Sequence, residues 1–134
     1  MDNAKSIFVF GSNLAGIHGA GAAKFARKHK GAIMSQGVGL FGQSYAIPTK
    51  DAKIQHTLPL KQIRDHVDIF LELAAAVDPD IQFQVTCIGC GLAGLHHKDI
   101  APMFRDASRE AENLFFDTLW KDYLCSQAKF WGTF

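Results

Sequence analysis

The sequence predicts an α/β fold, a three-layer α/β/α sandwich with a mixed sheet. The first observation is that strand-like and helix-like patterns alternate along the 134 residues, as expected when helices cover a sheet. The second is that two apolar strand patterns, at residues 7–10 and 85–88, each lead into a glycine-rich loop. The length suits one domain and is too short for two cores. We therefore expect residues 1–134 to form a single domain.

The first half of the chain is predicted as strand, helix, strand and strand. After the first strand, residues 20–29 are rich in alanine and end in a basic run before Gly31, which is typical of a helix terminus. Residues 31–34 are predicted as a short strand and residues 44–47, before Pro48, as another. The glycines between these two strands predict a flexible loop, and residues 50–57 a polar connector.

The second half of the chain begins with an amphipathic helix. Its apolar stripe recurs at helical spacing and ends before Pro79; the stripe consists of Ile63, Val67, Phe70, Leu71, Ala74 and Val77. Residues 82–88 read as a central strand. Asp99 is the expected N-cap of the next helix, with Pro102 in its first turn. Residues 113–116 and 118–125 are predicted as a last strand and a terminal helix.

Composition and charge exclude several classes of function. The formal net charge of +1 gives no reason to expect a broad nucleic-acid-binding surface. No apolar run approaches the roughly 18–20 residues of a membrane span, and the first residues show no signal-peptide pattern. Three cysteines, an odd number, provide no disulfide framework. We expect a cytoplasmic protein without a membrane partner, and the oligomeric state stays open.

The two glycine-rich loops are the most informative feature of the chain. Glycine lets a backbone turn sharply and approach a ligand closely, and a loop between a strand and a helix directs free N–H groups at one point. That arrangement suits a phosphate or another anion. Either loop alone could also be only a tight connection. Together they predict the two walls of a diphosphate cleft.

The loops are neither a Walker P-loop nor a dinucleotide-binding fingerprint. No Gly-Lys-Ser/Thr follows the glycines, and the spacing of Gly-x-Gly-x-x-Gly is absent. The predicted ligand-binding residues are Gly11, Ser12, Asn13, Gly19, Ala20, Gly21, Gly89, Cys90, Gly91, Leu92, Ala93 and Gly94.

These loops resemble those of macrodomains. The similarity is closest to the branch that contains the terminal ADP-ribose–protein glycohydrolase and the DNA ADP-ribosyl glycohydrolase antitoxins, and it runs over residues 7–104. It is carried by the strings Gly11-Ser12-Asn13, Gly19-Ala20-Gly21-Ala22-Ala23, Tyr45-Ala46-Ile47-Pro48-Thr49-Lys50 and Ile88-Gly89-Cys90-Gly91-Leu92.

The resemblance implies a macrodomain-like fold that binds ADP-ribose, or protein or nucleic acid carrying it, without a cofactor. The first loop would meet the distal ribose and the second would cradle the diphosphate. Lys50, the implied catalytic residue, would attack the anomeric carbon of the distal ribose. The chain departs from the branch in having Ala93 where an acidic residue is expected. It also starts too late to hold the strands that carry an adenine-contacting aspartate in many macrodomains.

The function therefore has two main interpretations. One is an ADP-ribosyl hydrolase weakened by Ala93, and the other is a non-catalytic reader or sponge of ADP-ribose-type ligands. Asp99 lies six residues beyond Ala93, and we do not assign it as the missing acid. A weaker alternative is a thiol-dependent enzyme that uses Cys90.

Three polar side chains of the site have competing roles. Lys50 is either a site residue or a solvated loop lysine, and a nucleophilic lysine needs its amine deprotonated. The amide of Asn13 can bind a ribose hydroxyl or its own backbone, and we favour the ligand. His18 is expected to be an exposed loop side chain.

Cys87 and Cys90 have the spacing of redox and zinc sites. Because Cys87 falls within a predicted strand and Cys90 in a loop, we expect neither a disulfide nor a metal site there. Adjacent His96 and His97 are the only nearby candidates for further zinc ligands, and neighbours rarely both reach one metal. Cys87 is expected to be a small buried apolar residue.

The aromatic tail has no single predicted role. Its members are Trp120, Tyr123, Phe130, Trp131 and Phe134. Most of them are expected to fill the core or cover an open sheet edge, while stacking on adenine and dimer formation stay open as alternatives.

Overall fold

The computed structural model describes residues 6–134 and has an α/β fold built on one mixed sheet. The six strands lie in the order β2-β3-β1-β4-β5-β6. They span Ser6–Asn13 (β1), Gly39–Phe41 (β2), Ser44–Lys50 (β3), Gln82–Val85 (β4), Leu114–Asp117 (β5) and Lys129–Gly132 (β6). Only β2 pairs antiparallel with its neighbour, and the other pairs are parallel. The predicted mixed sheet is confirmed.

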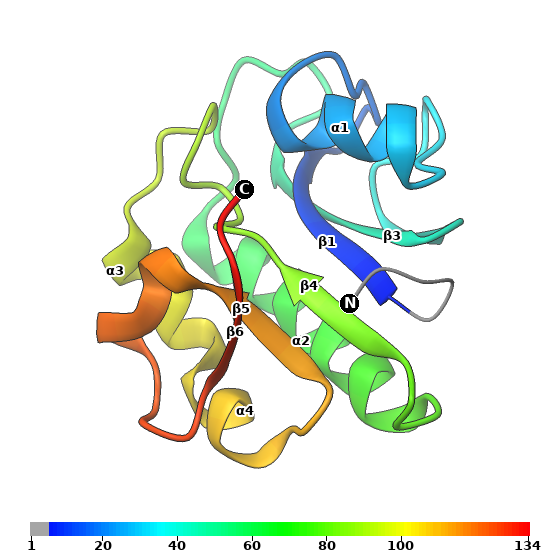
Figure 1. The fold of residues 1–134 in the computed structure, drawn as a ribbon. Coiled ribbons are helices and arrows are strands. Elements are labelled where there is room, and N and C mark those ends of the chain that lie inside the picture. Colours follow the sequence, from blue (N-terminus) through cyan, green and yellow to red (C-terminus); the bar gives the residue numbers. More distant parts are fainter. Residues whose placement is uncertain (1–5) are drawn as a thin grey trace.

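The helices connect these strands (Figure 1). They are α1 (Gly21–His29), α2 (Leu60–Ala76), α3 (His97–Ile100) and α4 (Arg105–Glu110), together with the 3₁₀ helices η1 (Ala101–Phe104) and η2 (Thr118–Tyr123). The described residues contain no helix that is long and apolar enough to cross a membrane.

β1 lies at the centre of the packing because both of its faces are buried. Ile7 and Val9 belong to the larger apolar cluster, which includes the buried face of α2. Phe8 and Phe10 belong to a second cluster with Ala26 of α1. Because successive side chains of a strand point to opposite faces, the two clusters lie on opposite sides of β1.

The predicted strand at residues 31–34 is wrong, and the chain there forms an irregular loop. Backbone groups in this segment are already engaged in hydrogen bonds with the end of α1 and with Gln43, so they are not available to pair with a strand. Ala32 donates its N–H to the Ala26 carbonyl, and the Lys30 carbonyl accepts from Gln43. Gly31, at φ 78°, lies against Gly42. The glycine-rich stretch that follows, predicted as a flexible loop, instead contains the edge strand β2.

Four further features differ from the prediction. The strand at residues 82–88 ends at Val85, because Thr86 donates the last hydrogen bond of the ladder to the Val9 carbonyl and the Ile88 N–H then closes a turn onto the Thr86 carbonyl. α3 begins at His97, so Asp99 lies within the first turn and is not the N-cap. The predicted terminal helix is the 3₁₀ helix η2, which begins after Asp117 because that carboxylate accepts the Leu119 N–H at 2.9 Å. The polar connector starts one residue later, since Lys50 belongs to β3.

The aromatic tail divides between the core and the sheet edge. Trp120 is fully buried, while Phe130 and Trp131 lie in β6, a strand that the sequence did not predict. Trp131 donates its indole N–H to the Val85 carbonyl at 3.0 Å, which ties this edge to the middle of the sheet.

We expect the core around Phe70 to dominate stability. Phe70 is fully buried and its ring contacts Tyr45, Phe83 and Phe104. Phe70→Ala should lower the free energy of unfolding by about 3–5 kcal/mol because it leaves a cavity. Ile69→Ala, one residue away and 55% exposed, should change it by about 0.5 kcal/mol or less. Urea unfolding of both variants checks the difference, and equal losses would contradict this core assignment.

Candidate functional site

A cleft of about 670 Å³ lies where β3, β1, β4 and β5 end. The structure brings Lys50 and the predicted loop residues to this cleft, with the exception of Gly94. Gly94 ends the second loop and does not line the cleft. Its N–H donates to the Gly91 carbonyl at 3.0 Å and so closes a turn. The volume falls in the range typical of small-molecule sites.

The two glycine loops touch each other at the floor of the cleft. A Cβ on Gly11 would lie 3.0 Å from the backbone nitrogen of Gly89. A Cβ on Gly89 would lie 2.8 Å from Leu95, and the residue has a φ of 76°, which L side chains rarely adopt. Gly11 therefore lets the two loops approach this closely, whereas Gly89 is required by its own backbone conformation and by the packing of Leu95 against it.

The first loop is fixed by two of its side chains, one bonded to the backbone of the loop itself and one to the connection that precedes β2. The Asn13 amide donates to the Ile17 carbonyl at 2.9 Å and accepts the Ile17 N–H at 3.0 Å. The Ser12 hydroxyl donates to the Gly37 carbonyl. The structure thus gives Asn13 the turn-bonding role, and its contact with a ribose stays a prediction.

His18 is buried, so its predicted exposure is wrong. Its Nε2 lies 3.0 Å from the Gln36 carbonyl, and its ring packs edge-on against Phe10. The Arg27 side chain donates to the His18 carbonyl at 3.2 Å. The imidazole therefore packs between Phe10 of the core and Gln36 of the connection that precedes β2, and it holds the first loop against both.

Free backbone N–H groups of both loops line the cleft. α1 starts at Gly21 without a side-chain cap, and the N–H groups of residues 19–23 have no acceptor within residues 6–134. In the second loop the N–H groups of Gly89, Gly91, Leu92 and Ala93 are likewise free of any described acceptor. Such donors, together with the positive end of a helix dipole, attract anions.

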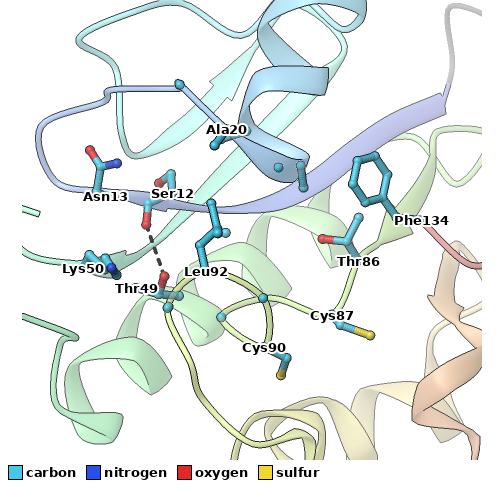
Figure 2. A pocket seen from close by; sticks show the side chains of 18 of the residues that line it. Ser12, Asn13, Ala20, Thr49, Lys50, Thr86, Cys87, Cys90, Leu92 and Phe134 are labelled. Atoms are coloured by element: carbon cyan, nitrogen blue, oxygen red, sulfur yellow. Dashed lines mark hydrogen bonds between the residues drawn. The ribbon is translucent and has the colours of Figure 1, made fainter.

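Lys50 is the last residue of β3 and is half-buried at one end of the cleft. No carboxylate of the described chain forms an ion pair with it. Figure 2 shows it beside Thr49, whose hydroxyl donates to the Ser12 carbonyl at 3.2 Å. The ammonium group is therefore available to a ligand.

Asp117 is the one carboxylate among the described residues that line the cleft, and the sequence reasoning missed it. Asp99, six residues past Ala93, is not among them. Asp117 is only 2% exposed. It accepts hydrogen bonds from the Leu119 N–H at 2.9 Å, the Thr133 hydroxyl at 3.1 Å and the Phe134 N–H at 3.2 Å. These bonds engage both carboxylate oxygens within the protein.

The thiols of Cys87 and Cys90 are both free and half-buried in the cleft wall. Cys87 lies beyond the end of β4 and is therefore less buried than predicted. Burial raises the pKa of Cys90 to about 11. Burial, and then the nearby Asp117 carboxylate, raise the pKa of Cys87. Since the thiolate is the nucleophilic form, these shifts argue against thiol chemistry at Cys90.

The described residues contain no group of three or more His, Cys, Asp or Glu side chains arranged to hold a metal ion. His97 instead accepts a hydrogen bond at Nδ1 from the Trp120 indole, at 2.9 Å.

The end of the cleft formed by η2 and the tail was not predicted. Its lining residues include His97, Asp117, Leu119 and Phe134. Asp117 could have been found from its place at the carboxyl end of a strand, because ligands of open α/β sheets bind there. Phe134 carried no such signal, since its position depends on how the tail folds back.

Comparison of the chain with protein-family models, curated proteins and solved structures gave no match. The class that the fold and the cleft define is an α/β protein with a mixed sheet and an amide-lined cleft at the carboxyl ends of its strands.

We expect Cys125 to be alkylated before the two cleft thiols. A backbone hydrogen bond at Gln127 is the main cause that lowers the pKa of Cys125. A lowered pKa increases the thiolate fraction near neutral pH, whereas the raised pKa values of Cys87 and Cys90 decrease it. Peptide mass spectrometry after brief iodoacetamide treatment checks the order. Labelling of Cys90 should accelerate only as the pH rises toward 11. Fast labelling of Cys90 at neutral pH would contradict this order and would again support a thiol-dependent enzyme.

Proposed function

We propose that this chain is a macrodomain-like protein of three-layer α/β/α architecture that binds ADP-ribose or ADP-ribosylated macromolecules. The observation that carries the proposal is the set of free N–H groups from two glycine loops that line one cleft. A diphosphate offers several acceptor oxygens and negative charge, and both are matched by convergent backbone amides and a helix N-terminus.

The order of the strands supports an elongated ligand with its anion in the middle. The strands that end at the cleft lie in the order β3-β1-β4-β5. At about 4.8 Å between neighbouring strands, the outer two are about 14 Å apart. The glycine loops follow the inner strands, β1 and β4, whereas Lys50 ends β3 and Leu119 follows β5. A diphosphate flanked by two larger groups fits this order.

The charge of the cleft also favours such a ligand. Lys50 is the only Lys or Arg among its described lining residues, and the carboxylate of Asp117 is engaged within the protein. The lining residues of the cleft thus provide one Lys side chain without an ion pair and several backbone N–H donors. Near the distal ribose, Lys50 would contact the hydroxyls or the anomeric carbon.

A second candidate function, a non-catalytic reader or sponge of ADP-ribose-type ligands, is favoured by Ala93. This residue lines the cleft, and its carbonyl accepts from the Thr57 hydroxyl at 3.1 Å. It contributes no acid to protonate or stabilise a leaving group. The weaker thiol-dependent alternative is disfavoured, because burial raises the pKa of Cys90 to about 11 and so decreases its thiolate fraction near neutral pH.

Gly91→Val should weaken ADP-ribose binding at least about tenfold, or ~1.4 kcal/mol. A Cβ at Gly91 meets no atom within 4 Å in the free protein, so the fold should tolerate the change. The added methyl groups would block the approach of the diphosphate to the loop amides. Calorimetric titration of both proteins measures the effect, with urea unfolding as the control for folding. Unchanged affinity in the folded variant would contradict the two-loop cleft.

Hydrolysis of ADP-ribosylated protein or DNA should be slow or absent in the wild type, although ADP-ribose binds. Ala93→Asp should raise turnover, because a general acid is typically worth about 10²–10⁴ in rate. Lys50→Ala in the Ala93→Asp background should abolish the gain. Release of ADP-ribose is the measurement, and robust wild-type turnover that survives Lys50→Ala would show that Lys50 is not the nucleophile.

A further inference from the structure

A second hollow, separate from the cleft, lies where the chain enters β4 and β5 (Figure 1). It is a groove of about 690 Å³ between the end of α2 and α4. Most of its lining is apolar and includes Leu71, Ala74, Val77 and Ala111. Because the cleft lies at the carboxyl ends of the same strands, the two share no lining residue. Binding in the groove is therefore independent of the ligand in the cleft.

The helix ends at this groove have an unusual distribution of charge. The C-terminus of a helix carries partial negative charge, so basic residues in the last turn are favourable. α1 follows this pattern with Arg27, Lys28 and His29, whereas α2 has no basic residue in its last turn. The chain after α2 adds Asp80 to the groove lining, and α4 ends on Glu110. A cation from outside the chain is favourable at such helix ends.

Two carboxylates at the groove lack a cationic partner. Glu110 and Glu112 line it, and neither forms an ion pair in the described part of the chain. Arg109 forms its ion pair within α4, and Lys129 donates to the Ala111 carbonyl at 3.5 Å. Neither of these cations is among the described lining residues, which include no Lys or Arg. The groove thus attracts positive charge and supplies none.

Asn113 places a neutral acceptor in the groove. The residue lines the groove and is only 9% exposed. Its Nδ2 donates to the Ala74 carbonyl at 3.0 Å, which fixes the orientation of the amide because a carbonyl can only accept. Oδ1 has no donor in the described part of the chain, yet it is not sealed inside the protein. The carbonyl of Ala75, another lining residue, is open as well, since the residue four positions on is Pro79, which has no N–H.

We propose that this groove is a docking site for a partner protein and receives an arginine side chain of that partner. The choice follows from charge complementarity, because a guanidinium is always charged and presents several N–H donors in a planar fork that suits carboxylate and amide oxygens. The fork donates to Asn113 Oδ1 and to Glu110 or Glu112, while the methylene stem of the arginine covers the apolar lining. The same carboxylates repel a nucleic acid or another anionic partner.

The test uses three peptides that differ at one residue. They are acetyl-Gly-Leu-Arg-Leu-Gly-amide and its counterparts with citrulline or lysine in place of arginine; citrulline keeps the shape of arginine and lacks the charge. NMR titration of the isotope-labelled full chain measures the affinities and locates binding through the side-chain amide signals of Asn113. The arginine peptide should shift these signals and bind about fivefold more tightly than the citrulline peptide, because hydrogen bonds to charged groups are the stronger ones.

Four results of this titration would overturn the proposal. The first is equal affinity for the arginine and citrulline peptides, and the second is the absence of shifts at Asn113. The third is a lysine peptide that binds as tightly as the arginine peptide, because the groove would then recognise charge without the fork. The fourth is a shift at Asn113 that depends on protein concentration without any peptide, which would assign the groove to a second copy of this chain.

Neighbouring positions of α2 provide a matched pair of variants. Ala75 is exposed and lines the groove, whereas Ala76 is exposed and does not line it. Ala75→Trp should fill the groove and weaken binding of the arginine peptide about tenfold or more. Ala76→Trp should leave the affinity unchanged. Urea unfolding of both variants is the control for folding, and equal affinities in two folded variants would contradict binding in the groove.

The carboxylates are tested without a change of shape. A double variant with Glu110→Gln and Glu112→Gln should lose most of the preference for arginine over citrulline and keep its affinity for the citrulline peptide. Glu72→Gln, an exposed carboxylate of α2 outside the groove, is the matched control and should retain the preference. A double variant with the full preference would show that these carboxylates do not hold the cation and would overturn the proposal.

Discussion

The cleft depends on the close approach of Gly11 and Gly89. β1 and β4 are adjacent parallel strands in register up to Val9 and Val85, so their glycine loops leave the sheet side by side. Both the N–H and the hydroxyl of Thr86 bond to the Val9 carbonyl, at 3.1 and 2.7 Å. These bonds set the direction in which the second loop departs. A side chain at Gly11 would press on the Gly89 backbone and separate the loops, and one at Gly89 would strain a positive φ and displace Leu95.

Much of this arrangement could be predicted because it depends on local sequence. The strand patterns of β1 and β4, the alanine-rich α1 and the apolar stripe of α2 each follow from spacing and residue type alone. The loops could be predicted for the same reason, since glycine after a strand marks a turn. In open parallel sheets the carboxyl ends of strands share one edge, so the loops were expected to meet.

The features that sequence did not reveal depend on contacts between distant segments. His18 looked like an exposed loop residue, but Gln36 and Phe10 enclose it after the chain folds back. β6 lacks a strong strand pattern and exists because it pairs with β5. Asp99 had the residue type of an N-cap, yet α3 begins two residues earlier at His97. Long-range packing overrides local preference in each case.

The order of strands in the sheet has a consequence for biosynthesis. β1 is synthesised before its two partner strands, β3 and β4, whose paired residues follow by about 36 and 76 positions, as in Phe8 with Ser44 and Ser6 with Gln82. Until then its apolar side chains, Phe8 and Phe10 among them, have no sheet to join. The far wall of the cleft is added later still, when Thr133 and Phe134 dock on Asp117. β1 therefore waits for its partner strands until β3 and then β4 have been synthesised, and the contacts of Thr133 and Phe134 with Asp117 become possible only after both.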